Sequence, residues 1–192
     1  VYFSGRAATV KIQGEDAGFL LSYDAEVARW PPHASPYLHA SPVRALGMRD
    51  LLSTLKGLAP RHKLVALDAS FSGYGLPVKD LHAVVGAPTI PDIERWLRRS
   101  VTHVFTAGRA VTAVHAGRPG AFTRSVFTRH LLDGLAGKAD TAGGRPDGVV
   151  GFDELAAYGR NRMVHAPTFS APPQAAQTGD GRFLFLVPSN RS

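Results

Sequence analysis

The chain of 192 residues contains no cysteine, and this absence excludes several kinds of site at once. Disulfide bonds, thiolate ligands for a metal and a cysteine nucleophile are all ruled out. The redox environment stays open, because a chain without thiols suits any compartment. No apolar run approaches the roughly 18 residues that a membrane span needs. We therefore expect a soluble chain that does not bind membranes, and we expect it in the cytoplasm.

Acidic residues are also few, with 15 aspartates and glutamates against 22 lysines and arginines and a net charge of +7. Basic chains can bind nucleic acid or anionic surfaces. The charges are scattered here, and the densest cluster is Arg95, Arg98 and Arg99. No basic run is interleaved with aromatic residues, which favours a solvated surface over a nucleic-acid groove. A basic anion-binding module is therefore the weakest of three functional hypotheses.

What is present is a composition typical of a globular protein, with 44% hydrophobic and 19% charged residues. A chain of this length can bury a sizeable core, so we expect a single domain over residues 1–192. Its centre is the stretch from Lys63 to Gly75, which reads K-L-V-A-L-D-A-S-F-S-G-Y-G. The apolar run Leu64–Leu67 predicts a strand buried on both faces. Small and polar residues follow it, at the edge of an open α/β sheet where ligands bind.

Hydrophobic periodicity predicts the other elements. We expect main strands near residues 1–4, 63–68, 101–107 and 182–187, with shorter ones near 8–12 and 18–22. Helices are expected over residues 41–57, 91–99, 122–135 and 152–163, and loops over 30–42 and 167–181. Strands that alternate with helices predict an α/β fold whose central sheet is mostly parallel and flanked by helices.

Two segments carry a resemblance to a known family. Residues 1–7 read V-Y-F-S-G-R-A, and residues 68–73 read D-A-S-F-S-G. They resemble the signature segments F-S-G-H-G and D-x-C-x-S-G of the caspase-like peptidases, in the metacaspase and bacterial caspase-like branch. The order of elements is similar along nearly the whole chain. Arg6 stands where the family has its histidine, and Ser70 stands where it has its cysteine.

The resemblance implies a three-layer caspase-like fold whose last strand is antiparallel to the others. The family's opening strand and helix would precede Val1, so we expect this chain to be an excerpt of a longer protein. In the family, a cysteine thiolate attacks the peptide carbonyl, a histidine moves the proton, and nearby backbone amides hold the oxyanion. Ala7 replaces the glycine on the oxyanion side of that site.

The residues at these positions do not suit peptide cleavage. Ser70 is a poor nucleophile without an adjacent base. Arg6 is not that base, because a guanidinium stays protonated up to a pKa above about 12. Our first hypothesis is therefore a degenerate caspase-like domain, a pseudo-peptidase that serves as a binding or regulatory module. The second hypothesis is a hydrolase that cleaves after basic residues, with Ser70 as nucleophile and His115 or a loop histidine as base.

The residues at the positions for substrate recognition match the resembled family better than the residues at the dyad positions do. In the metacaspase branch, the serine before the histidine and the aspartate before the cysteine form an acidic pocket for arginine or lysine. Those positions are Ser4 and Asp68, and we count Ser72 with them. A carboxylate suits a guanidinium through charge-assisted hydrogen bonds, so the implied partner is a peptide or protein segment with arginine or lysine. An equal alternative is that Arg6 fills this pocket within its own chain.

No metal or cofactor is expected. Asp147, Gly148, Val150 and Glu154 match the second half of an EF-hand calcium loop, but Gly143 and Arg145 stand at the first two ligand positions. A turn that leads into a helix is the better interpretation. His33 and His39 lie in a proline-rich segment without carboxylates, which favours exposed loop residues. His103 alternates with apolar neighbours, so we interpret it as a half-buried strand residue.

Overall fold

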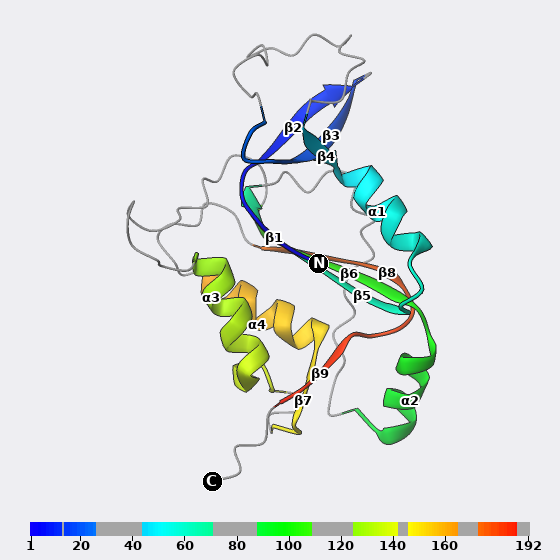
Figure 1. The fold of residues 1–192 in the computed structure, drawn as a ribbon. Coiled ribbons are helices and arrows are strands. Elements are labelled where there is room, and N and C mark those ends of the chain that lie inside the picture. The colour runs from blue at the N-terminus through cyan, green and yellow to red at the C-terminus, as the bar shows by residue number, and fades with distance from the viewer. Residues whose placement is uncertain are drawn as a thin grey trace.

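A computed structural model describes residues 1–12, 14–25, 44–70, 88–108, 125–141, 146–164 and 173–187 (Figure 1). Its strands are β1 (Tyr2–Ser4), β2 (Ala7–Ile12), β3 (Glu15–Leu21), β4 (Ala45–Gly47), β5 (His62–Ser70), β6 (Val101–Gly108), β7 (Val149–Gly151), β8 (Gln174–Gly179) and β9 (Leu184–Leu186). Its helices are α1 (Met48–Gly57), α2 (Ile90–Arg98), α3 (Val126–Asp133) and α4 (Phe152–Val164), and a π-helical turn, η2 (Gly134–Lys138), continues α3.

The central sheet has the strand order β1-β5-β6-β8. β1 and β6 both run parallel to β5, whereas β8 runs antiparallel to β6. Two smaller antiparallel sheets, β2-β3-β4 and β7-β9, stand beside it. The molecule is therefore an α/β protein with mixed sheets, and the predicted parallel pairing of its central strands is present.

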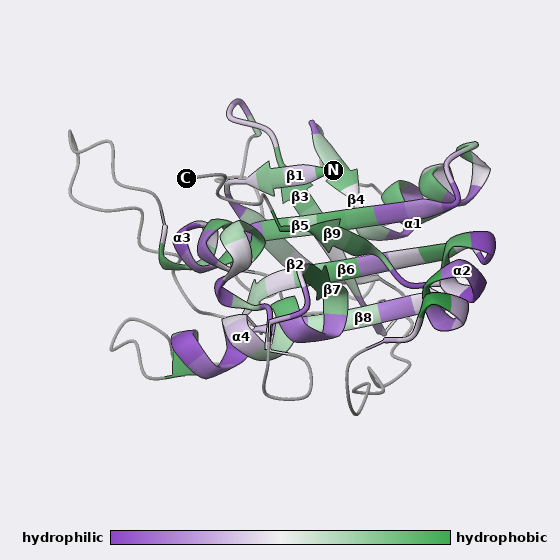
Figure 2. Cartoon of the chain, turned by 90° about the horizontal axis from the view of Figure 1, so that it is seen from below, coloured by the Kyte–Doolittle hydropathy of each residue, from purple (hydrophilic) through white to green (hydrophobic). Residues whose placement is uncertain are grey.

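Two hydrophobic clusters pack on opposite faces of the central sheet. One face holds Ala66 and Phe105 against Phe127 of α3 and Leu155 of α4. The other face holds Val65 and Leu67 against Met48, Leu51 and Leu55 of α1. Figure 1 shows α1 on one side of β5 and β6 and the α3–α4 pair on the other. Apolar residues run along β5 and β6, while the helices carry hydrophilic residues outward (Figure 2). The prediction that the central strand is buried on both faces is confirmed.

The antiparallel strand of the central sheet is not the one that the sequence predicts. The apolar segment at residues 182–187 forms β9, which pairs with β7 in the separate two-stranded sheet. The partner of β6 is β8, in a region predicted to be loop. Its sequence Q-A-A-Q-T-G lacks the β-branched and aromatic residues that indicate a strand. Tertiary packing decides its structure, because Ala175 and Ala176 are buried against the sheet.

Helix boundaries also differ from the expectation. The helix predicted from residue 41 begins only at Met48, because Ala45–Gly47 pairs with β3 as strand β4. Leu97 is 49% exposed, and α2 buries none of its residues. The helix predicted over residues 152–163 is confirmed as α4. None of the helices in the described part of the chain is long and apolar enough to cross a membrane.

Candidate functional site

The site is built where β1 and β5 lie side by side. The two strands are parallel, and Ser4 stands opposite Asp68 in their register. The Ser4 hydroxyl lies 3.4 Å from Oδ2 of Asp68. Residues distant in sequence are thus brought together because strand–helix–strand connections place parallel strands in one sheet. The two predicted recognition residues therefore lie in contact.

Asp68 is a buried carboxylate surrounded by hydroxyl groups. Its side chain is 1% exposed. Besides Ser4, three hydroxyl oxygens lie within hydrogen-bond distance of its Oδ2: that of Tyr2 at 3.3 Å, and those of Ser125 and Thr128 in close contact. The other oxygen, Oδ1, is buried and has no hydrogen-bond partner among the described residues. One half of the carboxylate is therefore saturated, and the other half lacks a donor.

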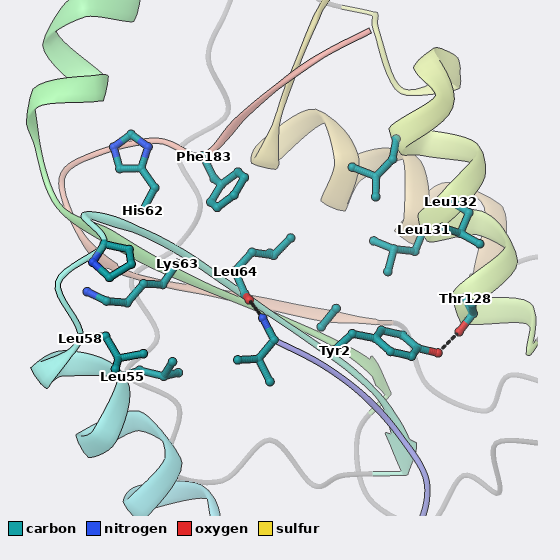
Figure 3. A pocket seen from close by; sticks show the side chains of 14 residues that line it. Tyr2, Leu55, Leu58, His62, Lys63, Leu64, Thr128, Leu131, Leu132 and Phe183 are labelled. Carbon is teal, nitrogen blue, oxygen red and sulfur yellow. Dashed lines mark hydrogen bonds between the residues drawn. The ribbon is translucent and has the colours of Figure 1, made fainter. Parts of the chain in front are cut away.

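The four hydroxyls cannot all donate to Oδ2 at the same time. The hydroxyl oxygens of Tyr2 and Thr128 are 2.6 Å apart, so one of them donates to the other (Figure 3). Each hydroxyl carries a single proton, and the member of this pair that donates to its neighbour does not donate to Asp68. The network thus joins β1, β5 and α3 around one oxygen atom.

The start of α3 supplies two of these hydroxyls. Ser125 is the N-cap residue, and its Oγ accepts a hydrogen bond from the backbone N–H of Thr128 at 3.0 Å. Such caps satisfy backbone donors that a helix end leaves unpaired. Sequence reasoning missed both residues, because it predicted that this helix begins at residue 122 and therefore treated Ser125 as a helix-interior position. A serine directly before the first residue of an apolar helical stripe is the signal that marks the cap.

Arg6 and Ser70, which the resemblance places at the dyad positions, both lie at the carboxyl ends of the parallel strands β1 and β5. Arg6 follows β1 and is exposed; its backbone oxygen accepts from the N–H of Leu21 at 2.9 Å. Ala7 opens β2 opposite Leu20. Ser70 ends β5 opposite Gly108, beyond an irregularity in the ladder after Leu67. These backbone positions follow the chain directly from Ser4 and Asp68.

Arg6 does not pair with Asp68. Both residues belong to the described part of the chain, and no hydrogen bond or ion pair joins them there. The alternative in which Arg6 pairs with Asp68 of its own chain is therefore not seen among the described residues. Ser72, His115, His33 and His39 lie outside the described residues.

Two carboxylates accept backbone hydrogen bonds in the described part of the half-matched calcium loop. Asp140 accepts hydrogen bonds from the backbone N–H groups of Asp147 and Gly148, both at 2.9 Å. The carboxylate of Glu154 accepts from the N–H groups of Thr141 and Gly151. Burial, the main cause, raises the pKa of Glu154. Within the described ranges, no cluster of three or more histidines, aspartates or glutamates is arranged to hold a metal.

His103 lies deep in the core, so the prediction that it is half-buried underestimates its burial. Its side chain is 1% exposed and stacks on Phe152 with ring centroids 4.0 Å apart. Its Nε2 accepts from the backbone N–H of Phe183 at 3.3 Å. Burial, and secondly the charge of Arg182, lower the pKa of His103 to about 3. A neutral, packed imidazole of this kind is a structural residue.

Comparison of the chain with models of protein families, with curated proteins and with solved structures finds no match.

Proposed function

We propose that this chain is a degenerate caspase-like domain that binds a peptide segment with arginine or lysine and does not cleave it. The observation that carries the proposal is the environment of Asp68. Its carboxylate is buried, its Oδ2 is held by hydroxyls, and its Oδ1 has no donor among the described residues. It lies directly beside the strand ends that bear Arg6 and Ser70.

An unpaired buried acceptor is costly, by about 1–3 kcal/mol for a polar group and more for a charged one. Within the described residues, no lysine or arginine forms an ion pair with Asp68. A guanidinium or ammonium group from a partner supplies both the missing donor and the missing positive charge. The hydroxyls of Ser4, Tyr2, Ser125 and Thr128 keep the carboxylate in place for it.

The residues beside this pocket do not support cleavage. Arg6 stands at the position of the family's base, and a guanidinium does not exchange protons near neutral pH. Without a base, the hydroxyl of a serine remains a weak nucleophile. Binding without turnover is therefore the function that this combination supports.

The test uses a library of short peptides that each carry one arginine or lysine, and a matched library with citrulline or norleucine in their place. We expect the chain to bind the basic library and to leave it intact by mass spectrometry. Asp68→Asn should weaken binding at least tenfold, because the amide carries no negative charge. Asp180→Asn, which removes an exposed carboxylate elsewhere, should leave binding unchanged.

Two results contradict the proposal. Equal affinity of the wild type and Asp68→Asn, with both proteins folded by circular dichroism, removes Asp68 from the binding site. Peptide cleavage by the wild type that disappears in Ser70→Ala establishes the hydrolase hypothesis instead.

A further inference from the structure

The arginines of this chain differ in whether they have an acidic partner. The three that form the densest cluster in the sequence are each paired in the structure: Arg95 with Asp92 at 2.7 Å, Arg98 with Glu94 at 3.6 Å and Arg99 with Asp180 at 4.0 Å. Arg129 on α3 and Arg162 on α4 are exposed, and neither forms an ion pair with a described residue. The fold therefore brings two unpaired guanidinium groups onto neighbouring helices.

The ring of Tyr158 on α4 connects Arg162 to a histidine of α3. The imidazole of His130 meets this ring at 73°, with ring centroids 6.3 Å apart. The guanidinium carbon of Arg162 lies over the same ring, 5.5 Å from its centre. A guanidinium that stacks on an aromatic face keeps its in-plane N–H donors for other partners. Arg129, His130, Tyr158 and Arg162 are called the α3–α4 cluster below.

His130 has an unused donor in this cluster. Neither of its ring nitrogens hydrogen-bonds to a described residue, and Nδ1 is buried. A neutral imidazole has one N–H donor and one bare acceptor nitrogen. Because a buried donor without an acceptor is costly, the proton belongs on Nε2, where a ligand can accept it.

The surroundings of His130 carry an excess of positive charge. Burial is the main cause that lowers its pKa, and the charges of Arg129, Arg162 and Lys138 act in the same direction. Asp133 opposes them, but its carboxylate accepts a hydrogen bond from Lys138 at 2.9 Å. Three positive charges and one negative charge leave an excess of two. An anion with two negative charges is the complementary ligand.

The α3–α4 cluster is separate from the Asp68 site and from the groove beside β1. Thr128 and Leu132 line that groove, together with Tyr2 of β1 (Figure 3). Positions two residues apart point to opposite sides of a helix. His130 therefore faces away from β1, in agreement with its contact with α4. What lies beside β1 in the complete protein has no bearing on this cluster.

We propose that the α3–α4 cluster binds the phosphate group of a ligand. The guanidinium groups of Arg129 and Arg162 donate to its oxygens, and Nε2 of His130 supplies a further donor. Such charge-assisted hydrogen bonds are among the strong ones, and arginine suits the geometry of phosphate. The phosphate is either free in solution or attached to a side chain of a partner protein.

The first probe is sulfate, because it keeps both of its negative charges when the pH is varied. NMR follows the imidazole signals of His130 while sodium sulfate replaces sodium chloride at constant ionic strength. We expect saturable shifts, and Arg162→Gln should weaken binding at least tenfold. Arg160→Gln is the matched control, because Arg160 is an equally exposed arginine of α4 that lies two residues away, on the opposite side of the helix.

The role of His130 is tested by pH. Sulfate affinity should rise from pH 7.5 to pH 5.5, because a protonated imidazole adds positive charge beside the anion. His130→Gln keeps a donor but does not titrate, so this rise should disappear in the variant. A rise that His130→Gln leaves intact would remove His130 from the site.

Two phosphate probes at pH 7.5 distinguish the sources. Tighter binding of N-acetyl-phosphoserine amide than of inorganic phosphate assigns a phosphorylated side chain, and the reverse order assigns free phosphate. Shifts that do not saturate overturn the proposal, as does an affinity that Arg162→Gln and Arg160→Gln lower equally, because the overall positive charge would then explain the binding. Asp68→Asn should leave sulfate binding unchanged, so the two proposed sites are tested independently.

Discussion

Asp68 and His103 are buried polar residues on neighbouring strands, and their surroundings give them different roles. Both are 1% exposed. Asp68 is surrounded by hydroxyl groups and leaves one oxygen without a donor in the described structure. His103 is stacked on an aromatic ring and accepts a backbone hydrogen bond. The proposed peptide site rests on the carboxylate, whereas the imidazole is packed in the core.

The neutral state of His103 predicts a pH dependence of stability. Its pKa is about 3 in the folded chain, against an ordinary value of 6.5. A lowered pKa means that the unfolded chain binds the proton first as pH falls, so unfolding is favoured progressively from pH 6.5 downward. By pH 5 the loss from this residue is roughly 2 kcal/mol of the free energy of unfolding.

The measurement is urea denaturation at pH 7.5 and at pH 5 for the wild type and His103→Phe. The phenylalanine keeps an aromatic ring on Phe152 but cannot take a proton. We expect the wild type to lose more stability than the variant over this interval. Equal losses in the two proteins would show that His103 does not titrate as its burial requires.

At the scale of elements, β5 organises the molecule. It pairs on both edges and carries residues of both hydrophobic clusters. The sequence of β5 predicted this central position, because an uninterrupted apolar run is typical of a strand covered on both faces. The sequences of β4 and β8 did not predict strands, because they contain no β-branched hydrophobic or aromatic residues. These short strands form through pairing with a neighbouring strand.

Truncation of Leu67 tests the position of β5. Leu67 is fully buried between the sheet and α1, so Leu67→Ala should cost about 2–5 kcal/mol of the free energy of unfolding. Leu97→Ala makes the same chemical change at a half-exposed site on α2 and should cost much less. Similar costs for the two variants in urea denaturation would mean that β5 does not lie in the core.

At the scale of the whole molecule, the sequence predicted which strands lie side by side. It did not predict which side chains from other elements pack around the ends of those strands. Ser4 and Asp68 are brought together because each ends a strand of the parallel pair, and motif and topology together were enough to predict it. Ser125 and Thr128 reach Asp68 through packing of α3 against the sheet, which no local pattern encodes. The groove beside β1 could not be predicted either, because it depends on how several separate elements pack.

Restoring the lost dyad tests the central claim most directly. If residues 1–7 and 63–73 hold the caspase-like positions, Arg6→His with Ser70→Cys places an imidazole beside a thiol. An imidazole titrates near neutral pH, and a thiol beside it gains thiolate character. Ser70→Cys alone keeps Arg6, which can favour the thiolate by its charge but cannot deliver a proton to a leaving amine.

The measurement is the rate at which a thiol-directed probe that carries arginine labels the two variants, followed by turnover of an arginine peptide. The account predicts faster labelling of the double variant than of Ser70→Cys, and turnover by the double variant alone. That turnover can be weak, since Ala7 replaces the glycine of the family's oxyanion side. Equal labelling of the two variants, with no turnover by either, would contradict the assignment of Arg6 and Ser70 and with it the proposed function.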